Sequence, residues 1–449
     1  MIRRRVIAVL IVVLFLTSLL VPSSQSSQDS SLTKKQQSEV LSQADSILKE
    51  LSTMLGISTV HPVQRQFMSR AQLRDLLLRY AKEQKNQATL EAERKTMVKF
   101  GFISKDFPYS QFALDLLTEQ IAGFYDYRTH QLNLMDSTPV NLQVPVLIHE
   151  LTHALQDQEI NLKEFNEPAE HNDDLTEAHE SMVEGEATAV MLDYILQPSG
   201  RSLATLGFDV REMMNDAQAA AVSLPNYRNA PKAIQVILTA PYLYGTSFFQ
   251  FFRNHNDWPR AAALFKDPPS SMEQMMHPEK YFTHRDDPVA VAIPGLPQEL
   301  QKTWKPVDTN VLGELGMLLV CQQFLSDDNA KIASEGWGGD QYQLFEDTRG
   351  NLLLLLFSTW DTETDATQFF NSYRVLLDKK YKHLKLLNGE EHKLFRWDSD
   401  DNQVAVEIQG HDVIVIEGAP AAQFEALRTL LWKSAQTAPH HPAAKLDAP

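Results

Sequence analysis

The pentapeptide His149-Glu150-Leu151-Thr152-His153 places two imidazoles and one carboxylate at a spacing that suits metal-assisted hydrolysis. Residues four apart lie on one face of an α-helix, so both histidines can bind one zinc ion from the same side. The carboxylate of Glu150 lies beside them, where it can take a proton from a metal-polarised water molecule. We therefore expect Zn²⁺ as the cofactor, His149 and His153 as ligands and Glu150 as the general base.

The same residues have an ordinary alternative, which is a helix that carries two surface or core histidines. The surrounding sequence favours the metal site, because apolar residues recur at helical spacing and leave the histidines on or beside the other face. These apolar residues are Val144, Leu147, Ile148, Leu151, Ala154 and Leu155. The pattern predicts a helix over about 144–158.

A catalytic zinc usually has three protein ligands and one open position, so another segment must supply the third ligand. A second helix, predicted over about 174–196, carries Glu177, Glu180 and Glu184 on one face. Carboxylates that face inward are costly unless a cation neutralises them. We choose Glu184 as the ligand because Gly185 beside it permits close approach to the zinc helix. Glu180 remains the alternative.

Other polar residues are candidates for supporting roles. Thr188 and Asp157 could orient a ligand through a hydrogen bond, or they could be ordinary surface residues. Acyl hydrolysis also needs a donor for the oxyanion, for which the candidates are His277, Tyr242 and Tyr244. We prefer His277 as this catalytic residue because it precedes a proline in a loop-like segment, where a side chain can project into a cleft.

These motifs resemble those of a known class of metallopeptidases. The segment from His149 to Ala154 resembles the active helix of thermolysin-type gluzincins, and Val183–Ala187 is similar to the Glu-Gly-x-Ala segment that carries the glutamate ligand in several aminopeptidase-like gluzincins. A wider set of motifs resembles a group of poorly characterised exported bacterial metallopeptidases, in patches between about residues 115 and 420. Beyond the two zinc segments, these patches are Ala122–Asp126, Glu273-Gln274, His277–Tyr281 and Gly336–Asp340.

The sequence also departs from two zincin patterns. The metzincin extension is absent, because Gln156 and Glu159 stand where that class has glycine and its third histidine. The interval between His153 and Glu184 is longer than in thermolysin-like enzymes, which predicts an inserted loop around Phe165–Asp173. Residues 124–134 read as a β-hairpin, which in gluzincins would bind the substrate backbone by strand addition but could equally cover the core.

Length and charge limit the possible partners. The chain has 449 residues and a net charge of −17. An acidic protein repels phosphate backbones, so we expect no nucleic-acid partner. A single cysteine, Cys321, excludes an intramolecular disulfide and a thiolate metal cluster.

The N-terminus has the pattern of an export signal. Arg3-Arg4-Arg5 precedes the apolar run Val6–Val21, and a Ser- and Gln-rich stretch follows. The run is shorter than the ~20 residues that span a bilayer comfortably. We expect residues 1–24 to be a signal peptide or an N-terminal anchor, and the protein to be secreted, periplasmic or attached to the membrane by this segment.

The remaining chain predicts an α+β protein. We expect a linker over 25–39, a mainly helical zincin-like domain with a short sheet over 40–300, a smaller α+β domain over 305–436 and a disordered tail over 437–449. Strands are predicted at 342–346, 352–359, 394–397, 404–408 and 413–417, and helices at 366–379 and 421–434.

The expected function is therefore that of a zinc-dependent peptidase that cleaves peptides or proteins outside the cytoplasm. The alternative is a catalytically weak zincin-like scaffold that binds a cell-envelope partner through its C-terminal domain. The intact His149, Glu150 and His153 favour the enzyme, because a degenerate relative would commonly have lost one of them.

Overall fold

A computed structural model describes residues 31–57, 61–82, 84–167, 169, 171–214, 224–390 and 393–437. The predicted signal or anchor over 1–24 lies outside the described residues, as does almost all of the predicted tail over 437–449. Within the described ranges, no helix has both the length and the apolar composition needed to cross a membrane.

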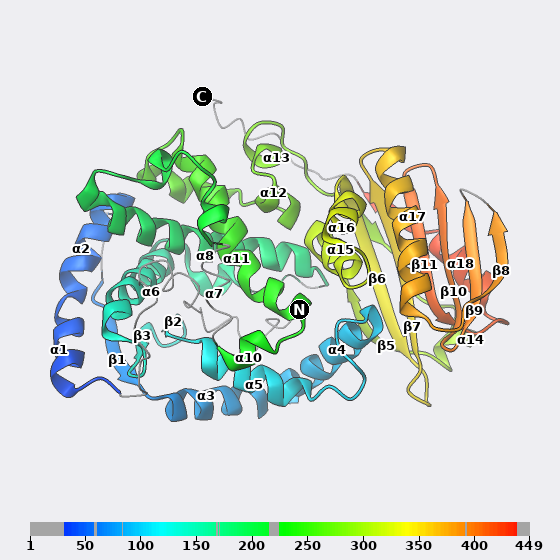
Figure 1. Ribbon diagram of the computed structural model, residues 1–449, viewed down its shortest axis with the longest axis horizontal. Helices are drawn as coiled ribbons and strands as arrows, with labels where there is room; N and C mark the ends of the chain where they lie inside the picture. Colours follow the sequence, from blue (N-terminus) through cyan, green and yellow to red (C-terminus); the bar gives the residue numbers. More distant parts are fainter. Residues whose placement is uncertain are drawn as a thin grey trace.

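Helices dominate the chain before residue 300, and the predicted α+β class is confirmed. The helices are α1 (Lys34–Ser42), α2 (Ala44–Leu55), α3 (Arg70–Lys82), α4 (Gln84–Phe100), α5 (Tyr109–Gln120), α6 (Val140–Ile160), α7 (Leu162–Phe165), α8 (Asp173–Leu196), α10 (Pro225–Arg228), α11 (Lys232–Arg253), α12 (Met272–Met276) and α13 (Glu279–Phe282). Short 3₁₀ segments are η2 (Gln197–Ser199), η3 (Leu203–Thr205) and η4 (Trp258–Lys266). Figure 1 shows this helical part at the left of the molecule.

The predicted linker over 25–39 ends earlier than expected, because α1 begins at Lys34. The Thr33 side chain caps this helix by accepting from the backbone N–H of Gln36, and the backbone N–H of Thr33 donates to Gln36 Oε1, which completes a capping box. Leu32 is buried, and its backbone N–H donates to the carbonyl of Asp136 at 2.9 Å. This part of the chain is therefore docked on the helical domain.

A three-stranded sheet in the order β1-β3-β2 lies beside α6. The predicted hairpin is confirmed as β2 (Gly123–Asp126) antiparallel to β3 (Gln131–Met135). β1 (Gln64–Met68) pairs with β3 in parallel, and the sequence analysis predicted no strand at these residues. The sheet leaves β2 as the edge strand nearest the predicted active-site helix.

The predicted zinc helix forms as α6, but it begins four residues earlier than expected. Pro145 therefore lies in the second turn rather than the first, where its missing N–H removes one backbone hydrogen bond. Residues 145–156 are buried around the whole circumference of the helix, including the polar face. That face packs against α8 and β2 instead of meeting solvent, and α8 in turn packs against α11.

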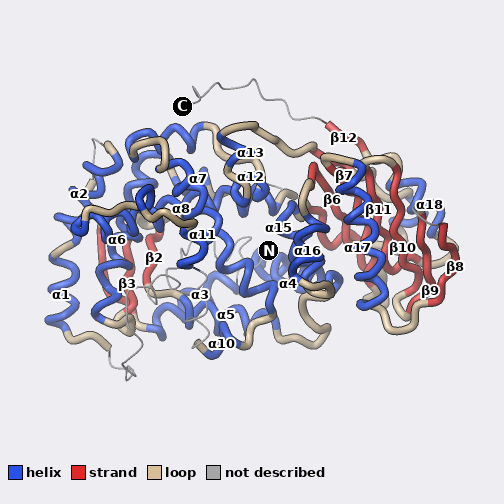
Figure 2. The backbone as a smooth tube through the Cα atoms, turned by 45° about the horizontal axis from the view of Figure 1, so that its top comes forward, coloured by secondary structure: helices blue, strands red, loops and turns tan. Residues whose placement is uncertain are grey.

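The C-terminal part is built on a seven-stranded antiparallel sheet in the order β5-β6-β7-β11-β10-β9-β8. Its strands are β5 (Lys305–Asn310), β6 (Trp337–Glu346), β7 (Leu352–Trp360), β8 (Lys385–Glu390), β9 (Leu394–Ser399), β10 (Asn402–Gln409) and β11 (Asp412–Ala419). The helices of this part are α14 (Gln298–Gln301), α15 (Gly313–Gln322), α16 (Asp327–Ser334), α17 (Glu363–Lys380) and α18 (Phe424–Leu431). Figures 1 and 2 show α15 and α16 between the sheet and the helical part.

The two faces of this sheet belong to different hydrophobic cores. Leu354 and Leu356 of β7 point into the core that contains α17 and continues through the helical part back to Val40. Leu353 and Leu355 point the other way, into a smaller core closed by α18. A last strand, β12 (Ala435–Thr437), returns to pair with β4 (Ala290–Ala292). The predicted division near residue 300 therefore separates two architectures but not two independent cores.

Candidate metal centre

Two neighbouring helices bring three potential ligands together in the interior. His149 and His153 project from α6, and Glu184 projects from α8. The two histidine Nε2 atoms lie 2.9 Å apart. Glu184 Oε2 lies 3.3 Å from His149 Nε2 and 3.7 Å from His153 Nε2. All three residues are buried, and together they could hold a metal ion.

This donor set fits a zinc ion. Ligand atoms bound tetrahedrally at zinc lie about 3.3 Å from one another, which is close to the three separations observed. Three donor atoms converge here away from water, and their lone pairs repel one another unless a cation lies between them. Two imidazoles and one carboxylate also match the ligand types of hydrolytic zinc sites.

The surroundings set these ligands in the protonation states that metal binding requires. Burial and, to a lesser extent, the adjacent His153 lower the pKa of His149 to about 4, against the opposing effect of Glu184. Burial opposes ionisation of Glu184, but the neighbouring imidazoles of His149 and His153 lower its pKa to about 2. At neutral pH the site therefore presents a neutral His149 and a charged Glu184, so a cation does not have to displace a proton from the carboxylate.

Glu150 lies next to this group and has an unusual environment. Its side chain is fully buried, and neither carboxylate oxygen has a hydrogen-bond partner among the described residues. Burial raises the pKa of Glu150 well above its ordinary value, the charge of Glu184 raises it further, and the backbone N–H of Tyr125 on β2 works in the opposite direction. A carboxyl group held without a protein partner is suited to proton exchange with a water molecule or a substrate.

The sequence analysis did not identify the residue that supports His153. Gln156 Oε1 lies 2.7 Å from His153 Nδ1, and Gln156 Nε2 donates to Glu186 Oε2 at 2.7 Å and to the carbonyl of Val183 at 3.0 Å. Gln156 follows His153 by three residues on the same helix, and that spacing was the available signal. Gln156 and Glu186 are both buried.

The two predicted supporting residues do not contact the ligands. Thr188 is fully buried, but its hydroxyl has no partner among the described residues. Asp157 lies at the end of α6 and accepts from the Tyr125 hydroxyl at 2.9 Å and from the backbone N–H of Leu162 at 3.0 Å. Asp157 also lies 2.9 Å from His130 Nδ1, so it joins the hairpin to α6 instead of orienting a ligand.

The structure does not bring His277 to the metal-ligand group. Tyr242 and Tyr244 lie two residues apart on α11 and so point in nearly opposite directions. The Tyr242 ring centroid is 6.3 Å from that of His149. Burial and the charge of Glu314 raise the pKa of Tyr244, and Glu314 Oε1 lies 3.0 Å from His277 Nε2. His277 is therefore paired with Glu314, and its role as the donor to the oxyanion stays a prediction, with Tyr242 as the candidate that contacts a ligand ring.

Gly185 allows a close helix approach, but not the one we predicted. A Cβ atom at Gly185 would lie 2.3 Å from the carbonyl carbon of Gly245, and one at Gly245 would lie 2.1 Å from the carbonyl oxygen of Ser181. The glycines therefore let α8 cross α11, rather than α6, at backbone contact. This crossing fixes α8 at the turn that carries Glu184.

We expect Gly185→Ala to destabilise the protein by about 1–3 kcal/mol, because the added methyl group meets backbone atoms that cannot move independently. Zinc affinity should fall as well, since the turn carrying Glu184 must shift. Thermal unfolding and metal titration would measure both effects. Gly295→Ala is the matched control, because a Cβ there meets nothing within 4 Å. Equal stability of the two variants would contradict the close-packing interpretation.

A second cluster of carboxylates is neutralised by a lysine side chain. Glu273, Asp286 and Asp361 lie close enough to bind a metal. Lys280 Nζ, however, donates to these carboxylates at 2.7, 2.8 and 3.0 Å. The ammonium group neutralises the cluster, so we assign no metal to it.

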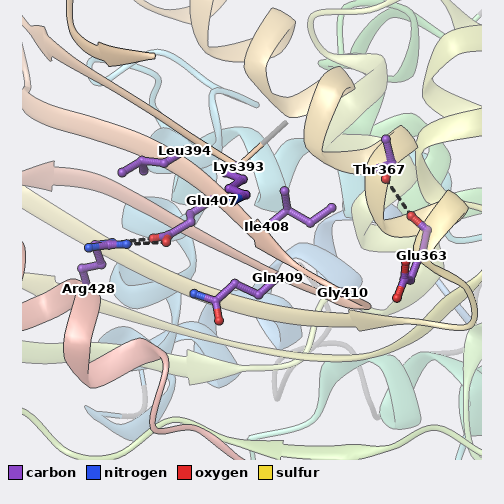
Figure 3. Close-up of a pocket in the computed structure, with 9 residues that line it drawn as sticks. All are labelled: Glu363, Thr367, Lys393, Leu394, Glu407, Ile408, Gln409, Gly410 and Arg428. Carbon is purple, nitrogen blue, oxygen red and sulfur yellow. Dashed lines mark hydrogen bonds and ion pairs between the residues drawn. The ribbon is translucent and has the colours of Figure 1, made fainter. Parts of the chain in front are cut away.

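A pocket of about 510 Å³ opens in the C-terminal part, as Figure 3 shows. Its walls come from α17, β9, β10, α18 and adjoining turns. Arg428 is paired with Glu407 through hydrogen bonds of 2.5 and 2.6 Å, so its guanidinium is already neutralised. The pocket receives no residue from α6 or α8 and is separate from the metal-ligand group.

Comparison with known proteins gives one family match. A family model described as a domain of unknown function (DUF8575) matches residues 301–428, which lie in the C-terminal part. No curated protein and no solved structure matches the chain.

Proposed function

We propose that this protein is a zinc-dependent peptidase that hydrolyses peptide bonds in peptides or proteins. The observation that carries the proposal is the buried convergence of His149, His153 and Glu184 next to Glu150, whose carboxylate oxygens have no hydrogen-bond partner among the described residues. The ligand group supplies a site for one cation, and Glu150 supplies a base within the same buried space.

The residues of the chain would divide the reaction between them. A zinc ion held by His149, His153 and Glu184 would act as a Lewis acid and lower the pKa of a water molecule. Glu150 would remove the proton from the attacking water and deliver it to the leaving nitrogen. The raised pKa of Glu150 suits this double role, because the carboxylate has a strong affinity for the proton it must carry.

Two further features support a peptide substrate. β2 is an edge strand whose Tyr125 backbone N–H acts on Glu150, so an extended chain added to this edge would run past the base. Tyr242 is in ring contact with His149 on the α11 side and is our proposed donor to the oxyanion. We further propose that the protein acts outside the cytoplasm, on the basis of the N-terminal sequence pattern.

Metal analysis together with a proteolysis assay tests the proposal. Purified protein should contain about one zinc ion per chain, and His149→Ala should lose it. Hydrolysis of an unfolded protein such as casein should stop on addition of a chelator and return with zinc. A parent protein that binds no zinc even after incubation with the metal would overturn the proposal. Zinc binding without hydrolysis would instead favour the non-catalytic scaffold.

A further inference from the structure

The support of His153 runs through two buried side chains in series. Gln156 lies between His153 on one side and Glu186 with the Val183 carbonyl on the other. Gln156 is 3% exposed and Glu186 is 4% exposed, so water does not compete for these hydrogen bonds. The chemistry of each group therefore determines which atom donates and which accepts in each of these hydrogen bonds.

The orientation of the Gln156 amide follows from its partners. Glu186 and the Val183 carbonyl both offer acceptor oxygens, and both accept from Gln156 Nε2. The Val183 carbonyl can only accept, so turning the amide over would place an oxygen against it and lose that hydrogen bond. The amide oxygen must therefore face His153 Nδ1, at 2.7 Å.

An amide oxygen can only accept a hydrogen bond, so His153 Nδ1 must carry the ring proton. The other ring nitrogen, Nε2, is then unprotonated and directs its electron pair toward His149 and Glu184. We propose that Gln156 and Glu186 are positioning residues that fix His153 as its Nδ1–H tautomer, which presets the first ligand for the metal. This inference rests on the metal site of the proposed function but concerns a property of the metal-free protein.

The other histidine has no such support. His149 Nδ1 is buried and lacks a hydrogen-bond partner among the described residues. His149 Nε2 instead lies 3.3 Å from Glu184 Oε2 and 2.9 Å from the unprotonated Nε2 of His153, and both of these atoms can only accept, so in the metal-free protein the proton of His149 lies on Nε2 and must leave that nitrogen when a cation binds. The two ligands of α6 are therefore unequal, with His153 preset and His149 adjusting when the cation binds.

The test reads the tautomer directly in metal-free protein labelled with ¹⁵N at histidine. Ring ¹⁵N chemical shifts distinguish a protonated from an unprotonated nitrogen, and the variant His153→Gln identifies the signals of His153. We expect the Nδ1–H form of His153 in the parent protein. Gln156→Met keeps the side-chain length but removes the acceptor, so the Nδ1–H signature should be lost, and zinc affinity should fall about 10- to 100-fold.

Matched variants separate this effect from a general loss of structure. Gln158→Met makes the same change on the same helix, where Gln158 exchanges hydrogen bonds with the backbone of His61, and should leave tautomer and affinity unchanged. Glu186→Gln preserves shape and can either donate or accept, so His153 should become a mixture of tautomers with a smaller loss of affinity. If Gln156→Met fails to fold, Glu186→Gln decides the matter alone.

Two results would overturn the inference. One is an Nε2–H form of His153 in the metal-free parent protein, and the other is an unchanged tautomer and zinc affinity in the variants at Gln156 and Glu186 that fold. Absence of hydrolysis would refute the proposed function but would leave the tautomer measurement valid. The two proposals can therefore fail separately.

Discussion

Glu150→Gln is expected to bind zinc as the parent protein does and to lose about 10²- to 10⁴-fold in the rate constant for hydrolysis. Glutamine has the shape of glutamate, and Glu150 is not among the three converging ligands, so the metal site should survive. The amide cannot accept a proton from water at neutral pH, so the base is removed. Metal analysis and steady-state kinetics on one preparation would show both properties.

The control is Glu164→Gln, which makes the same chemical change at an exposed position on the neighbouring short helix α7. It should leave both zinc content and rate unchanged. Retention of the parent rate by Glu150→Gln, with zinc bound, would exclude Glu150 as the base. Loss of zinc in this variant would show instead that Glu150 takes part in holding the metal.

Glu184→Ala is expected to weaken zinc binding by more than about 100-fold, because removing a ligand should cost more than removing a residue that only supports one. The carboxylate is the negatively charged member of the ligand group, and its removal takes that charge away from the cation. Competition against a chelator of known affinity would measure the loss. Zinc should also raise the unfolding temperature of the parent protein but not that of the variant, since a ligand stabilises only the form that binds it.

Glu180→Ala is the matched variant for this experiment. Glu180 lies one turn before Glu184 on α8, is partly exposed and does not belong to the converging group. Its charge acts on Tyr127, whose pKa is raised to about 12 mainly by burial. Zinc binding that is lost in Glu180→Ala and retained in Glu184→Ala would reverse our choice of ligand.

The two histidines of the candidate site could be predicted because their arrangement depends only on their spacing along one helix. The spacing of His149 and His153 places both on one helix face, and this helix needs no knowledge of the remaining fold. Glu184 was selected from a face of carboxylates, and the structure brings it to the histidines. The reason given for that choice was wrong, however, because Gly185 meets α11, and sequence patterns do not show which helix will be the neighbour.

The supporting residues could not be predicted in the same way. His277 was chosen from its loop-like setting, and the sequence does not show that Glu314 would be its partner. Gln156 looked like an unremarkable polar residue until α8 placed Glu186 and the Val183 carbonyl opposite its amide. These roles arise from contacts between helices that are distant in sequence.

The strands missed in the fold share a physical cause. β5 and β8 are the two edges of the large sheet, and β1 is an edge of the small one. Edge strands carry polar residues and proline, such as Pro306 in β5, so they lack the continuous apolar run of central strands that are buried on both faces. The central strands β7, β10 and β11 have that pattern and were predicted within a few residues of their observed bounds.

The core on the outer face of the large sheet has a consequence for how this chain can be divided. The matched family stretch covers residues 301–428, but this core also contains Val291, Ile293, Leu296, Leu300 and Leu431. A fragment excised at the family bounds would lack these apolar residues and both strands of the β4–β12 pair. It would also expose the opposite face of the sheet, which shares its core with the helical part. The segment matched by the family model is therefore smaller than the unit that can fold. Its sheet also needs the helical part, which covers one of its two faces.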